Sequence, residues 1–196
     1  MGRRRIPIRR YGQFSYRQSA FDGTVSVWLR DDPDAGLASE FPVDPFHISR
    51  HPADGSFYLD LTRLNDWRYG CPRKLRFGIY GDSQAQDMFV GGQLIFVGDL
   101  GRIDQQWHHI AATWRNANSG REDAAGALYV DGVLRGWMEG YEHRLSWDID
   151  QMTIGLGPRY VGEMDELLIL DVALSPEQIA AMQGLGRPVG DLLRFI

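Results

Sequence analysis

A series of short β-branched and aromatic runs, interrupted by Gly, Asp, Pro and Asn, constrains the fold of this 196-residue chain more than any other feature. Runs of this kind, bounded by turn residues, are typical of consecutive strands. We predict about nine strands, at residues 23–30, 56–62, 74–81, 93–98, 107–115, 126–130, 133–140, 151–157 and 164–171. Because no helical pattern separates them, βαβ units are excluded. The expected fold is all-β, an antiparallel two-sheet sandwich of the jelly-roll type.

Two connections between strands have recognisable turn chemistry. Asp131-Gly132 separates two of the runs, and this pair tolerates the positive φ angles of a two-residue hairpin turn. We therefore expect 126–130 and 133–138 to be antiparallel neighbours. The polar, glycine-bearing stretch 115–126 predicts a long hairpin loop.

One short helix is expected towards the C-terminus. Ser175 supplies a capping hydroxyl, Pro176 suits the first helical turn, and Gln178 follows three residues after the cap. The pattern predicts a helix over 176–183 that stops at Gly184.

Composition narrows the classes of partner. Hydrophobic residues make up 43% and charged residues 24%, as in ordinary globular domains, and a net charge of -5 offers nucleic acid no broad basic field. No apolar run approaches the roughly 18–20 residues of a membrane-spanning helix, so no membrane insertion is expected. The single Cys71 excludes an internal disulfide and cysteine-cluster zinc sites.

Arginines crowd the first ten residues, at positions 3, 4, 5, 9 and 10. We predict a loosely held leader over 1–15 and one domain over 16–196. The alternative is that the arginines contact a phosphate or an acidic partner. No apolar core of about 7–15 residues follows them, so this segment is not a secretory signal as it stands.

Two adjacent histidines, His108 and His109, lie within WHHIAATW at 107–114. Successive side chains on a strand leave opposite faces, so these imidazoles cannot both bind one metal ion. We interpret them as hydrogen-bonded structural side chains, and a functional role for one of them is the alternative.

The segment HIAATW, His109 to Trp114, resembles the pentraxin signature, in which His, any residue, Cys, any residue, Ser or Thr, and Trp follow in order. Three further segments are similar to motifs of laminin-G-like and pentraxin-like jelly rolls of the concanavalin A-like lectin and glucanase superfamily, including domains of planctomycete-type bacteria: DGTVSVWLRDDPD (22–34), LYVDG (128–132) and VGEMDELLILDVALSPEQI (161–179). The resemblance implies the same fold and an exported or cell-surface protein.

The chain departs from pentraxins at two places. Ala111 stands at the cysteine position, so the inter-sheet disulfide of pentraxins is missing. Pentraxins hold two calcium ions in a late acidic loop, whereas the matching stretch here, 155–165, has few carboxylates before Glu163. We therefore do not carry over the phosphocholine-type calcium site, and we predict no oligomeric state.

Laminarinase-type relatives cleave glycosidic bonds with two glutamates and an aspartate on one face of a strand. Glu163 and Asp165 have the required alternation, but the next position on that face is Leu167, or Leu168 if a bulge intervenes. Without the second catalytic carboxylate, no acid protonates the leaving oxygen. We therefore predict that the chain is not an enzyme.

Relatives of this fold often link the first strand to the last through calcium, which takes carboxylate oxygens as ligands. Asp22 and Asp165 occupy the matching places, so the resemblance suggests one structural Ca2+ held by both. The alternative is that Asp22 caps a turn and that Asp165 accepts backbone hydrogen bonds.

Four aromatic residues stand in polar surroundings: Trp67, Tyr69, Trp137 and Tyr141. Sugar sites commonly combine an exposed aromatic face with neighbouring polar groups, so these residues are our candidate ligand contacts. The alternative is that they anchor loops on the sandwich.

These observations predict a non-catalytic recognition or adhesion module, carbohydrate-binding, within or beside a larger exported or surface protein. A structural or protein-interaction domain without a small ligand is the alternative. A glycoside hydrolase or polysaccharide lyase ranks third.

Overall fold

The structure is a computed structural model that describes residues 4–7, 20–31, 43–50, 56–61, 75–80, 106–145, 152–157, 160 and 162–185. Within these residues it has ten strands and one helix: β1 (Arg4–Pro7), β2 (Phe21–Asp31), β3 (Val43–Arg50), β4 (Ser56–Leu61), β5 (Leu75–Tyr80), β6 (His108–Ala117), β7 (Glu122–Val130), β8 (Val133–Glu142), β9 (Met152–Leu156), β10 (Gly162–Leu170) and α1 (Pro176–Gln183).

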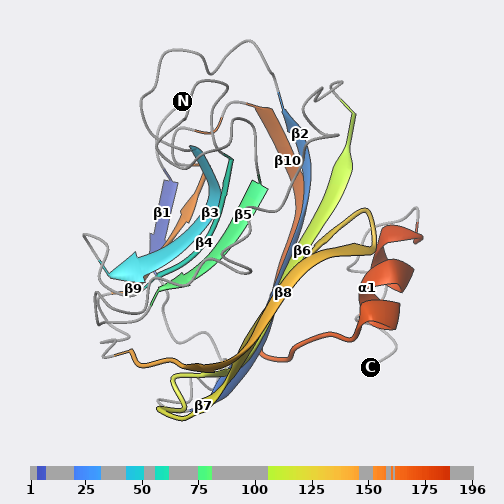
Figure 1. Cartoon of the computed structure of the whole chain (residues 1–196). Coiled ribbons are helices and arrows are strands. Elements are labelled where there is room, and N and C mark those ends of the chain that lie inside the picture. Colours follow the sequence, from blue (N-terminus) through green and yellow to red (C-terminus); the bar gives the residue numbers. More distant parts are fainter. Residues whose placement is uncertain are drawn as a thin grey trace, which may run out of the picture.

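The strands form two sheets in which all paired neighbours are antiparallel. Sheet A has the order β1-β9-β3-β4-β5, and sheet B has the order β10-β2-β6-β7-β8. The two sheets face each other as layers, and α1 lies on the side of sheet B that is turned away from sheet A (Figure 1). The predicted jelly-roll sandwich with one short C-terminal helix is confirmed.

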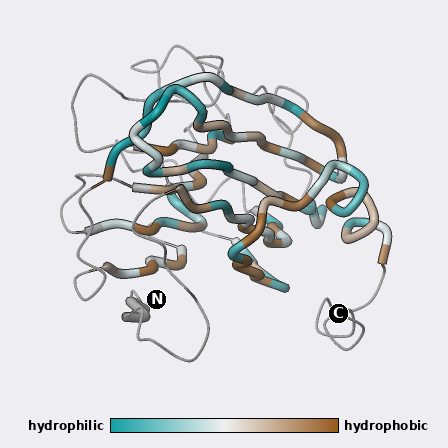
Figure 2. Tube along the Cα trace, turned by 90° about the horizontal axis from the view of Figure 1, so that it is seen from below, coloured by the Kyte–Doolittle hydropathy of each residue, from teal (hydrophilic) through white to brown (hydrophobic). Residues whose placement is uncertain are grey.

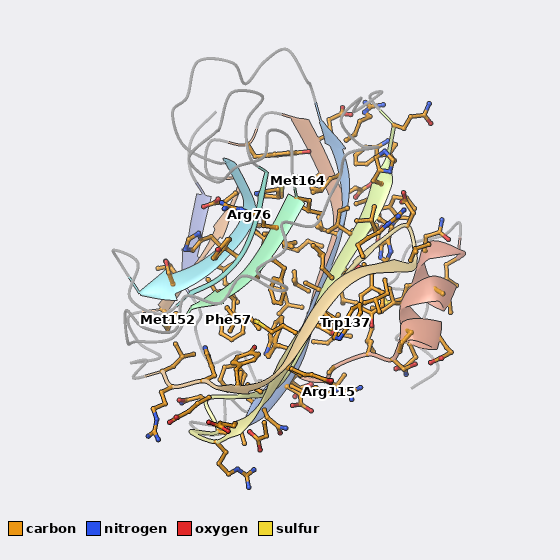
Figure 3. All side chains as sticks on the ribbon, in the orientation of Figure 1. Phe57, Arg76, Arg115, Trp137, Met152 and Met164 are labelled. Atoms are coloured by element: carbon orange, nitrogen blue, oxygen red, sulfur yellow. The ribbon has the colours of Figure 1, made fainter. Side chains whose placement is uncertain are left out.

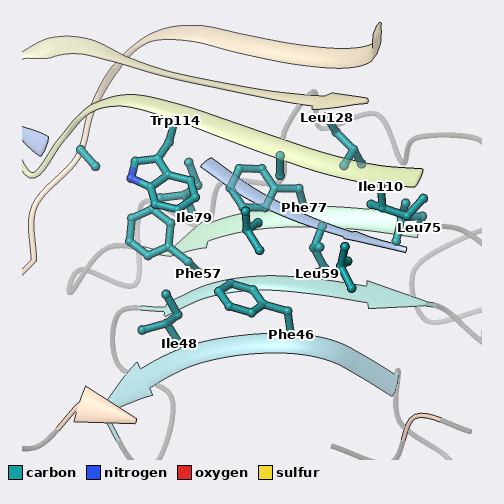
Figure 4. Close-up of a cluster of buried hydrophobic side chains, with 14 of the residues drawn as sticks. Phe46, Ile48, Phe57, Leu59, Leu75, Phe77, Ile79, Ile110, Trp114 and Leu128 are labelled. Atoms are coloured by element: carbon teal, nitrogen blue, oxygen red, sulfur yellow. The ribbon is translucent and has the colours of Figure 1, made fainter. Parts of the chain in front are cut away.

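The core lies between the sheets and is built from inward-facing side chains of strands in both sheets. Hydrophilic and hydrophobic residues alternate along the strands (Figure 2), as strands with one buried face require. At the centre, the Trp114 ring of β6 packs between two phenylalanines of sheet A, with centroids 4.9 Å from Phe57 and 6.1 Å from Phe77 (Figure 4). The aromatic rings thus connect the two sheets without a disulfide.

Every predicted strand that falls within the described residues is present, and 93–98 lies outside them. Strand β3 was not predicted from the sequence, because Pro45 interrupts its pattern. The register between β3 and β4 shifts between Val43 and Phe46, so the proline occupies an irregular position where its missing N–H interrupts no regular ladder.

The predicted long loop over 115–126 is wrong. Strand β6 continues to Ala117 and β7 begins at Glu122, which leaves a connection of only 118–121. Asn116, Asn118 and Gly120 have φ angles of 52°, 61° and 68°. Asparagine and glycine tolerate this left-handed region, so the chain reverses within a few residues instead of forming a loop.

Part of the segment predicted as a leader belongs to sheet A. Within 1–15, strand β1 pairs with β9 from Arg4, opposite Leu156, to Pro7, opposite Thr153. Edge strands of natural sheets often carry charged residues, so an arginine-rich edge strand and a solvated leader have similar composition.

Helix α1 has the predicted bounds and cap. The Ser175 hydroxyl accepts from the Gln178 backbone N–H at 3.3 Å, and the Gln178 side chain accepts from the Ser175 N–H at 2.8 Å. Ile179 and Met182 are its buried residues, and Ile179 packs on sheet B. Among the described residues, no helix has the length and apolar character needed to cross a membrane.

Candidate functional site

The face of sheet B that is turned away from sheet A, here called the outer face, carries most of the candidate residues. On β6, Ile110, Ala112 and Trp114 point into the core cluster. The alternate residues therefore point outward, and among them Ala111 packs with Ile179 of α1. The outer face carries His109, the two carboxylates of β10 and Trp137.

The two histidines diverge as expected for a strand. His108 Nδ1 lies 2.8 Å from an Asp131 carboxylate oxygen, whereas His109 Nε2 lies 2.8 Å from the Ser26 hydroxyl on the outer face. The other Asp131 oxygen accepts from the His109 backbone N–H at 2.9 Å. The imidazoles therefore have separate partners and do not share one ion site.

Ser26 and His109 are each only 1% exposed, so their hydrogen-bonded pair cannot be reached by a substrate. Burial lowers the pKa of His109 from its ordinary value, and nearby Asp131 raises the pKa by a smaller amount. The imidazole is neutral at neutral pH and acts as a structural side chain.

The buried imidazole predicts an acid-sensitive stability. Because the pKa of His109 is lower in the folded chain, the unfolded chain binds more protons below pH 6.5, the ordinary value. The free energy of unfolding should fall on acidification by at most about 1.4 kcal/mol per pH unit and should gain nothing from this group above pH 6.5. Urea unfolding at pH 5.5 and 7.5 measures the effect. His109→Gln should reduce the pH dependence, and an identical pH dependence in both proteins would contradict the assignment.

The carboxylates of β10 share the outer face with a leucine. Glu163 lies opposite Arg30, and Asp165 lies opposite Trp28. The register then shifts through a bulge at Glu166, which has a φ angle of 52°, and Leu168 lies opposite Ser26. The bulge therefore places Leu168 where a second acid would follow Glu163 and Asp165 on the outer face.

The structure does not bring together the two residues predicted to hold calcium. Asp165 lies opposite Trp28, which is six residues along β2 from Asp22, a span of about 20 Å. One ion contacts its oxygen ligands at about 2.3–2.6 Å and cannot bridge that span. Asp22 instead accepts from the Asn116 N–H, and Asp165 accepts from the Glu166 N–H, each at 2.9 Å. These bonds match the alternative interpretation, and they correct the predicted Asp22–Asp165 link.

In the part of the chain that the structure describes, no three His, Cys, Asp or Glu side chains gather closely enough to form a metal-binding group.

Two of the four predicted aromatic contacts lie outside the described residues, namely Trp67 and Tyr69. The other two are on β8 but do not share a surface. Trp137 lies opposite Ala127 on the outer face and is 62% exposed. Tyr141 contacts the buried His143 ring at 6.4 Å, and burial raises the pKa of its phenol. Tyr141 is therefore a packing residue, whereas Trp137 is accessible.

Trp137 stands on an open platform of small and polar residues. Thr113, Ala127 and Trp137 follow one another across three neighbouring strands, and the next outward row has Arg115, Ala125 and Glu139. Figure 3 shows Trp137 and Arg115 on the α1 side of sheet B and Phe57 between the sheets. We call the surface formed by five of these residues the Trp137 platform: Thr113, Arg115, Ala127, Trp137 and Glu139. An exposed indole beside short side chains leaves its face open, and the arginine and glutamate offer hydrogen-bonding groups nearby.

A second group of aromatic and charged residues was not predicted from the sequence. We call Trp28, Trp107, Arg30, Glu163 and Asp165 the two-tryptophan block. Arg30 pairs with Glu163, and its guanidinium carbon lies 5.2 Å from the centroid of the Trp107 ring. Trp28 lies 5.3 Å from the His109 ring. The alternation of Trp28 and Arg30 with core residues in VSVWLR was the available signal for their shared face.

A family model of the laminin G type, described as the concanavalin A-like lectin/glucanases superfamily, matches residues 12–180. The chain belongs to this superfamily. It contains both binding domains and glucanases, so membership alone does not decide whether the chain is catalytic. None of the curated proteins matches the sequence at a significant level.

Solved structures that are similar to this chain include an arabinanase domain, a pentraxin and a neurotoxin. Domain 4 of AbnA, a GH43 extracellular arabinanase from Geobacillus stearothermophilus in complex with arabinotriose, has a TM-score of 0.51 and 19% identity, with 84% of this chain and 68% of that chain covered. A heptameric SAP-like pentraxin from Limulus polyphemus has a TM-score of 0.50 and 16% identity, with coverages of 84% and 70%.

The third similar structure is from botulinum neurotoxin type C, whose cell entry depends on interaction with two ganglioside molecules. Its TM-score is 0.55 at 12% identity, and the match covers 84% of this chain but only 35% of the toxin chain. The match thus spans about a third of that solved chain. At identities this low, the structural similarity shows a shared fold alone. The pentraxin match agrees with the resemblance seen in the sequence.

Proposed function

We propose that the chain is a non-catalytic glycan-recognition module, carried within or beside a larger exported or surface protein. The observation that carries the proposal is Trp137, which is 62% exposed on the outer face of edge strand β8. An indole exposed to water is unfavourable by the hydrophobic free energy that burial would recover. Stacking on the apolar face of a sugar ring recovers part of that free energy. Arg115 and Glu139 of the Trp137 platform supply donors and acceptors for hydroxyl groups.

The non-catalytic character rests on Leu168. Laminarinase-type relatives need two catalytic glutamates on one face of a strand, with an aspartate between them. Glu163 and Asp165 match the first glutamate and the aspartate, but the bulge presents Leu168 at the position of the second glutamate. An aliphatic side chain can neither protonate a leaving oxygen nor attack an anomeric carbon.

Known relatives give the proposal its ligand class. The arabinanase domain was solved with arabinotriose, and the neurotoxin interacts with gangliosides. Both ligands contain sugar residues, although the match covers only 35% of the toxin chain. These relatives support a glycan as the partner of this chain, and a glycan array identifies its sugar residues.

Replacing Trp137 by alanine tests the proposal. On a glycan array, the wild-type chain should bind a defined subset of polysaccharides or oligosaccharides, and Trp137→Ala should weaken binding at the platform by about tenfold or more. Calorimetry with the strongest array ligand then measures the affinity. Phenylalanine at position 137 should retain part of the binding, because it keeps an aromatic face.

Val133→Ala is the matched control for this experiment. Val133 is 52% exposed on the same strand, but it lies opposite the core residue Val130 and not on the outer face. Its loss should leave glycan affinity unchanged. If no glycan on the array binds the wild-type chain, the proposal is wrong. A protein-interaction domain would then be favoured, because Leu134, which is 43% exposed, extends the apolar surface of β8 towards the hairpin turn.

A further inference from the structure

We propose that the two-tryptophan block is a second glycan site, separate from the Trp137 platform, and that it accepts uncharged sugar residues and rejects acidic ones. The inference deepens the proposed function and rests on it for the ligand class.

The block is compact because the registers of three strands align its members. On β10 and β2, Glu163 lies opposite Arg30, and Asp165 lies opposite Trp28. On β2 and β6, Trp28 lies opposite His109, and Arg30 reaches Trp107 two residues before it. Residues that are opposite or diagonal across antiparallel strands lie about 5–8 Å apart, so one or two sugar rings can contact all of the block.

The block is accessible as well as compact. Trp107 is 38% exposed, and the side chains of Arg30 and Glu163 are 40% and 55% exposed. The ion pair between Arg30 and Glu163 holds the guanidinium against the Trp107 ring. These contacts hold the indole in one orientation, which reduces the conformational entropy that a ligand would have to remove.

The charges of the block select against anions. Arg30 is already paired with Glu163, and the Asp165 carboxylate adds a negative charge beside Trp28. A sialic acid, uronic acid or sulfate group on a sugar bound here would lie close to two carboxylates with one shared cation. Like charges at short range oppose binding, whereas the hydroxyl groups of a neutral sugar can donate to both carboxylates.

The block and the Trp137 platform are separate sites. Trp107, directly before β6, and Thr113 on β6 are six residues apart, which is about 20 Å along an extended chain. Between them, Ile179 of α1 packs over Ala111 and Tyr129. The helix therefore divides the outer face, and short oligosaccharides should bind the two regions independently.

The experiment uses the full chain and two substitutions. Array glycans are chosen in pairs that differ by one acidic group, such as lactose with sialyllactose and oligogalactose with oligogalacturonate, and the bound neutral members are titrated by calorimetry. We expect two molecules of a short neutral ligand per chain. Trp107→Ala should reduce this to one and weaken the lost site by about tenfold or more, whereas the thermal transition should move by only a few degrees.

Asp165→Asn tests the charge argument without disturbing the bulge, because the amide oxygen can still accept from the Glu166 N–H. It should raise the ratio of the affinity for the acidic member to the affinity for the neutral member of each pair, because it removes one of the two carboxylates that oppose an anion. If wild-type and Asp165→Asn chains discriminate equally, the selectivity argument is wrong. If Trp107→Ala binds as wild type while Trp137→Ala loses all binding, the second site is wrong but the proposed function stands. If the wild-type chain binds no glycan, the proposed function itself fails.

Discussion

Replacing Trp114 by alanine is expected to lower the free energy of unfolding by about 3–5 kcal/mol, the range for removing a large aromatic side chain from a packed core. Trp114 is 4% exposed and packs against Phe57 and Phe77 from the opposite sheet. Its removal takes away the contact that connects the sheets at their centre and leaves a cavity that fixed strands cannot fill. Urea unfolding followed by circular dichroism measures the loss.

Trp137→Ala is the matched control, because it is the same substitution on the same sheet and on the opposite face. Trp137 is 62% exposed, so its removal should change the free energy of unfolding by no more than about 0.5 kcal/mol. Equal losses for Trp114→Ala and Trp137→Ala would contradict the assignment of the inner and outer faces. The same pair of variants therefore separates a stability effect from the binding effect of Trp137.

Replacing Gly23 by alanine is expected to cost about 3 kcal/mol, at the upper end of the range for over-packing. A Cβ atom at this position would lie 2.1 Å from Cζ2 and 2.4 Å from Cε2 of Trp114. The indole cannot move aside, since Phe57 and Phe77 hold it from sheet A. Thermal and urea unfolding of Gly23→Ala measure the cost.

A double-mutant cycle tests whether contact with the Trp114 ring causes the loss of stability in Gly23→Ala. If the indole is the obstacle, Gly23→Ala in a Trp114→Ala background should cost less than about 1 kcal/mol, so the two effects should be strongly non-additive. Gly184→Ala is the control, because its added Cβ meets only ordinary contacts at 3.6 Å and its φ angle of -77° suits alanine. Additive effects for Gly23 and Trp114 would show that the close approach is not the reason.

Local patterns predicted the elements whose signals lie within a few residues. The capping box of Ser175 and Gln178, and the positive φ angles of Asp131 and Gly132, are properties of short segments, and both occur as expected. Strand β3 was not predicted, because Pro45 makes its local pattern irregular. The long loop predicted over 115–126 was wrong, because polar residues such as Asn116 occur in tight turns as well as in long loops.

The candidate sites depend on register, which local patterns do not contain. Alternation put Glu163 and Asp165 on one face, but the bulge at Glu166 decided that Leu168 follows them. Similarly, Trp137 and Tyr141 are close in sequence, yet irregular pairing with β7 turns them to opposite faces. Arg30 and Trp107 are far apart in sequence and meet only because β2 pairs with β6.

The sequence by itself determined the strand periodicity, the hairpin, the capped helix and the family motifs, because each depends on residues that are neighbours along the chain. The tertiary structure alone decided which distant residues share the outer face, how α1 divides that face, and why Asp22 and Asp165 are held apart. The physical reason is that a strand offers the same two faces whatever its partners are. Pairing register and bulges then select which side chains of different strands come within contact distance.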